Sequence, residues 1–155
     1  MKAKKVVTVA LLLLVAASVA AMVVNRLRGG SGDPGGQNQV VAYYFHGKAR
    51  CPTCESIQAQ AEEAVKTGFP EQLDKGQLDW RVVDYSAPGN EHLRKDYNLV
   101  AATVYLVKFT DGKPTGNENL ARVWELVDDK RAFTAYVQER LKAFLEGSKT
   151  QSDES

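Results

Sequence analysis

Hydrophobic positions divide the chain into a long apolar N-terminal run and a later region in which strand and helix patterns alternate. Residues 6–24 form an unbroken uncharged stretch of 19 residues, which is long enough to cross a hydrocarbon core as one helix. From residue 40 onward, short apolar runs typical of strands alternate with stretches whose apolar residues recur every three or four positions, as in amphipathic helices. The pattern predicts one N-terminal transmembrane helix followed by a single α/β domain.

The first strand and the first helix of the domain have the clearest sequence patterns. Residues 40–45 are too apolar for burial on one side only, so they predict a central strand with both faces covered. Residues 55–66 predict a helix, which Gly68 and Pro70 end. The apolar stripe of this helix consists of Cys54, Ile57, Ala61, Ala64 and Val65.

The remaining elements continue the alternation of strands and helices. In order, they are expected as a strand over 78–85, a short helix over 88–97, a strand over 103–109, a turn at 110–112, a short strand over 121–124, and a helix that Asp128 or Asp129 caps and Gly147 ends. This order predicts a three-layer sandwich in which helices flank a central mixed sheet.

Candidate chemistry is concentrated between the first strand and the first helix. Cys51 and Cys54 are the only cysteines of the chain, and a helix N-terminus favours a thiolate through its positive dipole and free N–H groups. Pro52 suits the first helical position, where its missing N–H costs nothing. We expect Cys51 to be the exposed, attacking thiol, and Cys54, on the apolar stripe, to be buried and to act second.

Two other interpretations of the cysteine pair stay open. The pair could be an inert structural disulfide, or it could bind copper or an iron–sulfur centre, shared between two chains. A complete zinc site usually needs four ligands, and the spacing of His46 and His92 matches no zinc-finger pattern. Haem attachment is excluded because residue 55 is Glu, whereas that motif requires His.

Charge separates the N-terminal region from the domain. The formal net charge is +1, but it is unevenly distributed. The first 28 residues hold five Lys and Arg residues and no acidic residue. Residues 29–155 hold 15 Lys and Arg against 19 Asp and Glu, a difference of −4. A mildly acidic domain gives no reason to expect nucleic acid as a partner.

The N-terminal run predicts export. Ser18-Val19-Ala20 would suit signal cleavage, but the apolar run continues past this point and is longer than a usual signal core. We therefore expect residues 1–28 to form an uncleaved single-pass anchor in the cell membrane, with the domain on the extracytoplasmic, periplasmic side. The alternative is a periplasmic or secreted protein after cleavage. Residues 29–38 form a Gly-rich linker, and residues 148–155 a polar tail.

Over about residues 39–147 the chain resembles the thioredoxin superfamily. The stretch Tyr43-Tyr44-Phe45-His46-Gly47 followed by Arg50-Cys51-x-Thr53-Cys54-x-x-Ile57 is similar to a bacterial thioredoxin-like family that carries the label nitrophenyl-compound nitroreductase subunit, the ArsF family. Residues 123–126 also resemble its C-terminal half. The resemblance implies a thioredoxin-like fold and a redox-active pair. No G-x-G-x-x-G loop follows a strand, so nothing indicates a flavin site, and no cofactor is expected.

Two departures from typical thioredoxins concern the surroundings of the sulfurs. Typical thioredoxins have a cis-proline before the third strand, where this chain has Thr103 after Ala102; both residues are candidates to offer main-chain groups to a bound partner. Thr103 could instead simply begin the strand. Typical thioredoxins also bury a carboxylate on the first strand. This chain has the aromatic residues 43–45 in that region instead.

His46 is the candidate replacement for that carboxylate. As a cation near Cys51 it would lower the pKa of the thiol, and near neutral pH it could carry a proton. The alternative is a loop residue bonded to backbone. Lys48 and Arg50 are expected to be solvated, and Tyr43, Tyr44 and Trp124 to belong to the core.

The residues together predict an exported, membrane-tethered protein that exchanges electrons with a protein thiol or disulfide of the membrane or periplasm. Two alternatives stay open beside it. One is an accessory subunit docked on a membrane partner, with a static disulfide or a cysteine-bound metal. The other is a protein that passes electrons to a nitroreductase.

Overall fold

The structure, a computed structural model, describes residues 38–149. The predicted transmembrane segment over residues 6–24 and most of the Gly-rich linker lie outside these residues. Between residues 38 and 149, no helix combines the length and the apolar character that a membrane crossing requires.

Four strands form one mixed sheet in the order β2-β1-β3-β4. β1 (Gln39–His46) runs parallel to β2 (Leu78–Asp84) and antiparallel to β3 (Thr103–Thr110), and β4 (Lys113–Asn119) pairs antiparallel with β3. All residues from 40 to 45 are buried. The prediction of a central strand covered on both faces is therefore confirmed.

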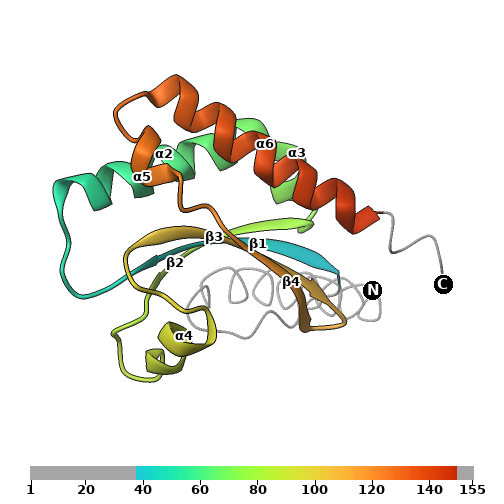
Figure 1. Ribbon diagram of the computed structural model, residues 1–155. Helices are drawn as coiled ribbons and strands as arrows, with labels where there is room; N and C mark the ends of the chain where they lie inside the picture. Colours follow the sequence, from blue (N-terminus) through green and yellow to red (C-terminus); the bar gives the residue numbers. More distant parts are fainter. Residues whose placement is uncertain (1–37, 150–155) are drawn as a thin grey trace, which may run out of the picture. The chain divides into compact units, whose positions relative to one another are not determined.

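Helices cover the two faces of the sheet unequally (Figure 1). α2 (Pro52–Gly68), α3 (Pro70–Asp74), α5 (Val123–Leu126) and α6 (Lys130–Lys149) lie on one face, and the short α4 (Glu91–Asp96) lies on the other. Two helix-covered faces around a mixed sheet, with the Cys pair where β1 leads into α2, make this an α/β thioredoxin-like fold. The predicted three layers are confirmed.

The core on the α2 side is built on the predicted helical stripe. All five members of that stripe are buried, and Ile57 is fully covered. α6 packs along α2 and contributes Phe133, Val137 and Leu141, each with no exposed surface. Because Cys54 belongs to the same cluster, the second sulfur-bearing residue is held by the core of the domain.

The core on the α4 side is aromatic. Phe45 stacks on Tyr43 with ring centroids 5.0 Å apart, and Tyr97 lies 5.2 Å from both Phe45 and Tyr105. Edge-to-face and offset contacts at these distances are favourable beyond the area that they bury. Tyr43 and Tyr44, predicted as core residues, are both buried, on opposite faces of β1.

The fourth strand is not where the sequence pattern predicts it. A strand over residues 121–124 is wrong, because Val123–Leu126 forms α5 and the strand is β4 instead. β4 consists of Lys, Pro, Thr, Gly, Asn and Glu and has no apolar alternation. It is a strand because a tight turn, with positive φ at Asp111 and Gly112, folds it back onto β3.

Three smaller differences concern the helices. Pro70 does not only end α2 but begins a further short helix, α3. Asp129 accepts a hydrogen bond from the Ala132 amide at 3.0 Å, as its predicted capping role requires, but α6 continues past Gly147 to residue 149. Trp124, expected in the core, keeps 38% of its side-chain surface exposed.

Candidate functional site

The two cysteines form a disulfide at the N-terminus of α2. Cys51 is the residue that caps the helix, and its Cα atom lies 5.0 Å from that of Cys54. The Cys54 amide donates to the Cys51 sulfur at 3.1 Å, and the Glu55 amide donates to the Cys51 carbonyl at 3.0 Å. Pro52 stands at the first helical position, as predicted. The Cys54 amide thus contacts the first sulfur at the positive end of the helix and would stabilise negative charge on it.

The two sulfur-bearing residues differ in exposure. Cys51 is partly exposed, whereas Cys54 keeps only 8% of its surface accessible. Pro52 and Thr53, between them, are exposed. The predicted burial of Cys54 and the greater exposure of Cys51 are confirmed, so a partner can reach the first sulfur more readily than the second.

Tyr44 of β1 is hydrogen-bonded to the main chain of the second cysteine. Its hydroxyl donates a 2.6 Å hydrogen bond to the Cys54 carbonyl. Burial raises the pKa of the Tyr44 phenol above its ordinary value of 10.0, against a smaller lowering by Arg50. The phenol therefore stays protonated and a donor at neutral pH. The sequence interpretation treated Tyr44 only as a core residue, although a buried tyrosine hydroxyl usually has a hydrogen-bond partner.

His46 is the last residue of β1, and its ring stacks on that of Tyr44 with centroids 6.0 Å apart. Its Nδ1 lies 2.9 Å from the Gly47 carbonyl oxygen. A carbonyl oxygen can only accept, so Nδ1 is the donor in this contact. The backbone contact that formed the alternative interpretation is therefore present. An effect of the His46 charge on Cys51 stays a prediction.

The loop between β1 and α2 is fixed at two points. A Cβ atom on Gly47 would lie 2.9 Å from the Tyr85 hydroxyl, so that Tyr85 packs directly against the glycine backbone. Arg50, expected to be solvated, is exposed, yet its Nη2 donates to Gln58 of α2 at 2.6 Å. Lys48 is exposed.

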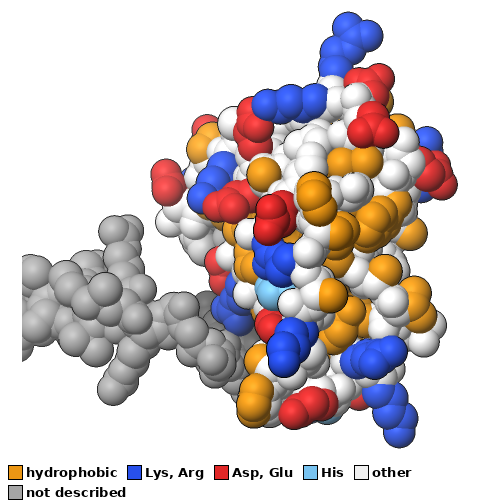
Figure 2. Space-filling model, turned by 90° about the vertical axis from the view of Figure 1, so that its left-hand side faces the viewer, with side chains coloured by type: hydrophobic (Ala, Val, Ile, Leu, Met, Phe, Trp, Pro, Cys, Tyr) orange, Lys and Arg blue, Asp and Glu red, His pale blue; other side chains and the backbone are white. Residues whose placement is uncertain are grey.

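An acidic side chain lies close to this basic loop. Hydrogen bonds from the Ser86 hydroxyl and amide lower the pKa of the Asp84 carboxyl, and His46 and Arg50 lower it further through their charge. Figure 2 shows the end of the domain at which α2 begins, where basic side chains lie beside a broad area of hydrophobic ones. A partner would meet both kinds of surface there.

The segment before β3 forms the other side of the site. Ala102 is 9% exposed and belongs to the same apolar cluster as Cys54, whereas Val100 is 87% exposed. The Thr103 hydroxyl is buried and donates to Asn119 of β4 at 2.7 Å. Contacts of Ala102 and Thr103 with a bound partner stay predictions.

Trp124 is the residue that sequence reasoning missed on this side. Its indole Nε1 donates to the Ala102 carbonyl at 2.8 Å across 22 positions of sequence. The sequence interpretation placed Trp124 in the core. No local pattern indicates this contact, because it depends on how the chain returns after β4.

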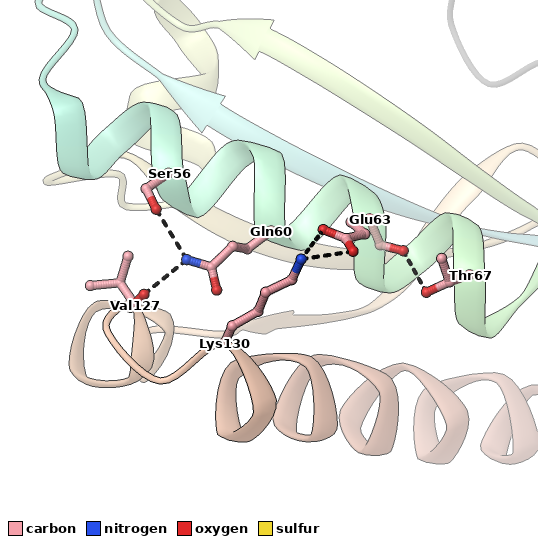
Figure 3. A network of polar contacts seen from close by, with 6 residues as sticks. All are labelled: Ser56, Gln60, Glu63, Thr67, Val127 and Lys130. Carbon is pink, nitrogen blue, oxygen red and sulfur yellow. Dashed lines mark hydrogen bonds and ion pairs between the residues drawn. The ribbon is translucent and has the colours of Figure 1, made fainter.

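A polar network ties α2 to the connection between α5 and α6 (Figure 3). Gln60 donates to Val127 O at 2.8 Å and to Ser56 Oγ at 3.0 Å, and Lys130 pairs with the Glu63 carboxylate at 2.8 Å. These contacts fix the helix that carries the Cys pair relative to α5. In the part of the chain that the structure describes, no group of three or more His, Cys, Asp or Glu side chains is arranged to hold a metal ion.

Comparisons with known proteins agree on the fold alone. No family model matches the chain, and no curated protein matches it. Thioredoxin f2 of Chlamydomonas reinhardtii is 16% identical over 59% of this chain and 76% of its own, with a TM-score of 0.37. The thioredoxin of Fasciola hepatica is 19% identical over 64% of this chain and 83% of its own, with a TM-score of 0.37.

A third similar structure contains the first two thioredoxin domains of Eps1p from Naumovozyma dairenensis. It is 18% identical over 70% of this chain and 37% of its own, with a TM-score of 0.42. At such identities and TM-scores, these proteins indicate nothing about the chemistry of this one.

Proposed function

We propose that this protein exchanges a disulfide with protein thiols through Cys51 and Cys54. The observation that carries the proposal is the asymmetric disulfide at the N-terminus of α2, with the first sulfur accessible and the second buried. The Cys54 amide, at the positive end of α2, would stabilise a thiolate at Cys51, and an accessible thiolate is the reactive form of cysteine. A purely structural disulfide needs neither accessibility nor this position.

The exchange involves four sulfur atoms, two of this protein and two of the partner, and it needs no other oxidant or reductant. In the reduced protein, the Cys51 thiolate attacks one sulfur of the partner's disulfide, forming a mixed disulfide and releasing the partner's other sulfur as a thiolate that takes a proton from water. Cys54 then loses its proton and attacks the Cys51 sulfur, which expels the second partner thiolate. Two electrons pass to the partner, and the Cys51–Cys54 bond forms. A partner dithiol drives the same steps in reverse.

Trapping variants test this assignment in the full-length protein. Cys54→Ser should accumulate a mixed disulfide on non-reducing gels, because the attacking thiol is present and the one that releases the partner is missing. Cys51→Ser is the matched control and should trap nothing. Trapping by Cys51→Ser alone would reverse the two roles. Absence of adducts with both variants, together with a wild-type disulfide that dithiothreitol cannot reduce in the folded state, would favour a static disulfide instead.

We propose that the domain works outside the cytoplasm, anchored by residues 6–24. The length of this apolar run and its basic N-terminal flank support the proposal. Alkaline carbonate should leave the protein with the membranes, and protease added to spheroplasts should digest the domain. Release with the soluble periplasmic fraction would refute the anchor, and protection from protease would refute export.

The motif over residues 43–57 supports a narrower proposal, that the chain is related to the bacterial thioredoxin-like proteins of the ArsF family. The partner is then expected among the protein thiols or disulfides of the membrane or periplasm. The adduct that Cys54→Ser traps in the native host would identify this partner by mass spectrometry. A trapped protein confined to the cytoplasm would contradict the expected location.

A further inference from the structure

The edge of β3 that faces β4 is open beside the disulfide. The pairing of β3 with β4 ends at Tyr105, which lies opposite Asn119. Beyond this pair, the Leu120 amide donates to the Val104 carbonyl at 2.9 Å, and the chain then turns into α5. Ala102 immediately precedes β3, and no strand within residues 38–149 pairs with it on this side.

Trp124 takes the position that the next strand hydrogen bond would have. In a strand, residues two apart direct their main-chain groups toward the same neighbour. The carbonyls of Ala102 and Val104 therefore share one edge, on which the Leu120 amide binds the second and the Trp124 indole the first. The side-chain N–H stands in for a main-chain N–H.

The short helix that carries the indole is anchored to the core and to α6. Val123 and Leu120, neighbours of Trp124 in the chain, are fully buried and anchor the short helix. Arg122 lies over the Tyr136 ring of α6, 5.3 Å from its centroid. Trp124 itself remains 38% exposed, so that an arriving chain can reach it.

We infer that Trp124 caps the open edge of β3 and selects against extended peptides at the redox site. The inference rests on the proposed thiol–disulfide exchange. An unpaired strand edge accepts an added strand through its main-chain groups. A peptide reacting with Cys51 would lie next to this edge, because Val104 lies opposite Tyr44, whose hydroxyl bonds the Cys54 carbonyl. Such a peptide must displace the indole from the Ala102 carbonyl. A small disulfide reaches the sulfur without using that carbonyl.

The test compares two substrates of the full-length protein, reduced beforehand with dithiothreitol that is then removed. One is the disulfide-linked dimer of a short alanine peptide with a central cysteine, and the other is bis(2-hydroxyethyl) disulfide. Trp124→Phe keeps an aromatic ring but removes the donor. It should raise the ratio of the second-order rate constant for oxidation of the reduced protein by the peptide disulfide to that for oxidation by the small disulfide by about two- to tenfold, the equivalent of one hydrogen bond.

Two controls make the result specific to the hydrogen bond. Trp80→Phe removes the other indole N–H of the chain, which is buried without a hydrogen-bond partner in the described residues, and should leave the ratio unchanged. A peptide dimer N-methylated on both sides of its cysteine lacks the competing N–H groups. With it, Trp124→Phe should give no increase.

The outcomes separate the inference from the function on which it rests. If the wild-type protein exchanges with neither substrate, the proposed function fails. If it exchanges with both and Trp124→Phe leaves the ratio unchanged, the edge cap alone is refuted. A lower ratio would refute it as well, because the indole would then be a contact that peptides use.

Discussion

The two sides of the disulfide are held in different ways. On one side, residues 47–50 connect β1 to α2, with Lys48 and Arg50 exposed and Tyr85 packed against Gly47. On the other side, Ala102 is buried in the core and its carbonyl is bonded by Trp124. The first side is polar and basic, whereas the second is apolar and anchored in the sheet.

This difference assigns different surroundings to the two sulfurs. Cys51 follows the exposed loop, is partly exposed and packs at the margin of the cluster, whereas Cys54 is a buried member of that cluster together with Ile57 and Ala102. The apolar side therefore fixes the position of the Cys54 sulfur, and the polar side determines which charged groups lie near the Cys51 sulfur. Each of the following changes except the last acts on one side and should leave the other intact.

The largest effect should come from the core beneath Cys54. Ile57→Ala removes a side chain with no exposed surface, and the cavity should lower the free energy of unfolding by about 2–5 kcal/mol. Val100→Ala, on the exposed segment before β3, is the control and should change it by less than about 0.5 kcal/mol. Urea unfolding measures both. If the two substitutions lower the free energy of unfolding equally, the core beneath Cys54 does not contribute the stability that its burial indicates.

A smaller effect should follow from removing one hydroxyl under the second cysteine. Tyr44→Phe breaks the hydrogen bond to the Cys54 carbonyl and should cost about 1 kcal/mol of stability. Amide exchange in the first turn of α2 should accelerate, because this bond ties that turn to β1. Tyr105→Phe removes a comparable bond to Asn117 on the other face and serves as the control. If both variants accelerate amide exchange in α2 to a similar extent, a positioning role for Tyr44 is refuted.

The loop side should respond in reactivity rather than in stability. If the positive form of His46 supports the Cys51 thiolate, His46→Ala raises the pKa of that thiol, and iodoacetamide alkylation of the reduced protein at neutral pH should slow by roughly two- to threefold. His92→Ala removes the other histidine of the chain, exposed on α4, and is the matched control. An alkylation profile that coincides with the wild type would leave the helix terminus as the source of Cys51 reactivity.

The smallest effect should appear only in alkali and, unlike the others, involves both faces of β1. Burial raises the pKa of the Tyr43 and Tyr44 phenols above 10.0, so the fold favours their protonated forms. Their contribution to stability is complete below pH 10 and is lost as the pH rises toward the raised values. The unfolding free energy should therefore fall above pH 10, and less steeply in Tyr43→Phe. A slope that this substitution leaves unchanged would assign the loss to other groups.

Local pattern predicted the parts of this protein that depend on neighbours in sequence. The unbroken apolar run over 40–45 indicated a strand buried on both faces, and the three- and four-residue spacing after Cys51 indicated the buried stripe of α2. Pro52 and the helix start followed from the same stretch. These features are recoverable because periodicity states directly which side chains share a face.

Only the tertiary structure decided the contacts between distant segments. β4 has no apolar alternation and is a strand because β3 offers it an edge, while residues 121–124 carry a strand-like composition yet turn into α5 over the buried Val123. The bonds from Tyr44 to Cys54 and from Trp124 to Ala102 join residues 10 and 22 positions apart. Hydrogen-bond partners of this kind are set by how the elements pack, because a side chain alone specifies that it needs a partner and not which one it meets.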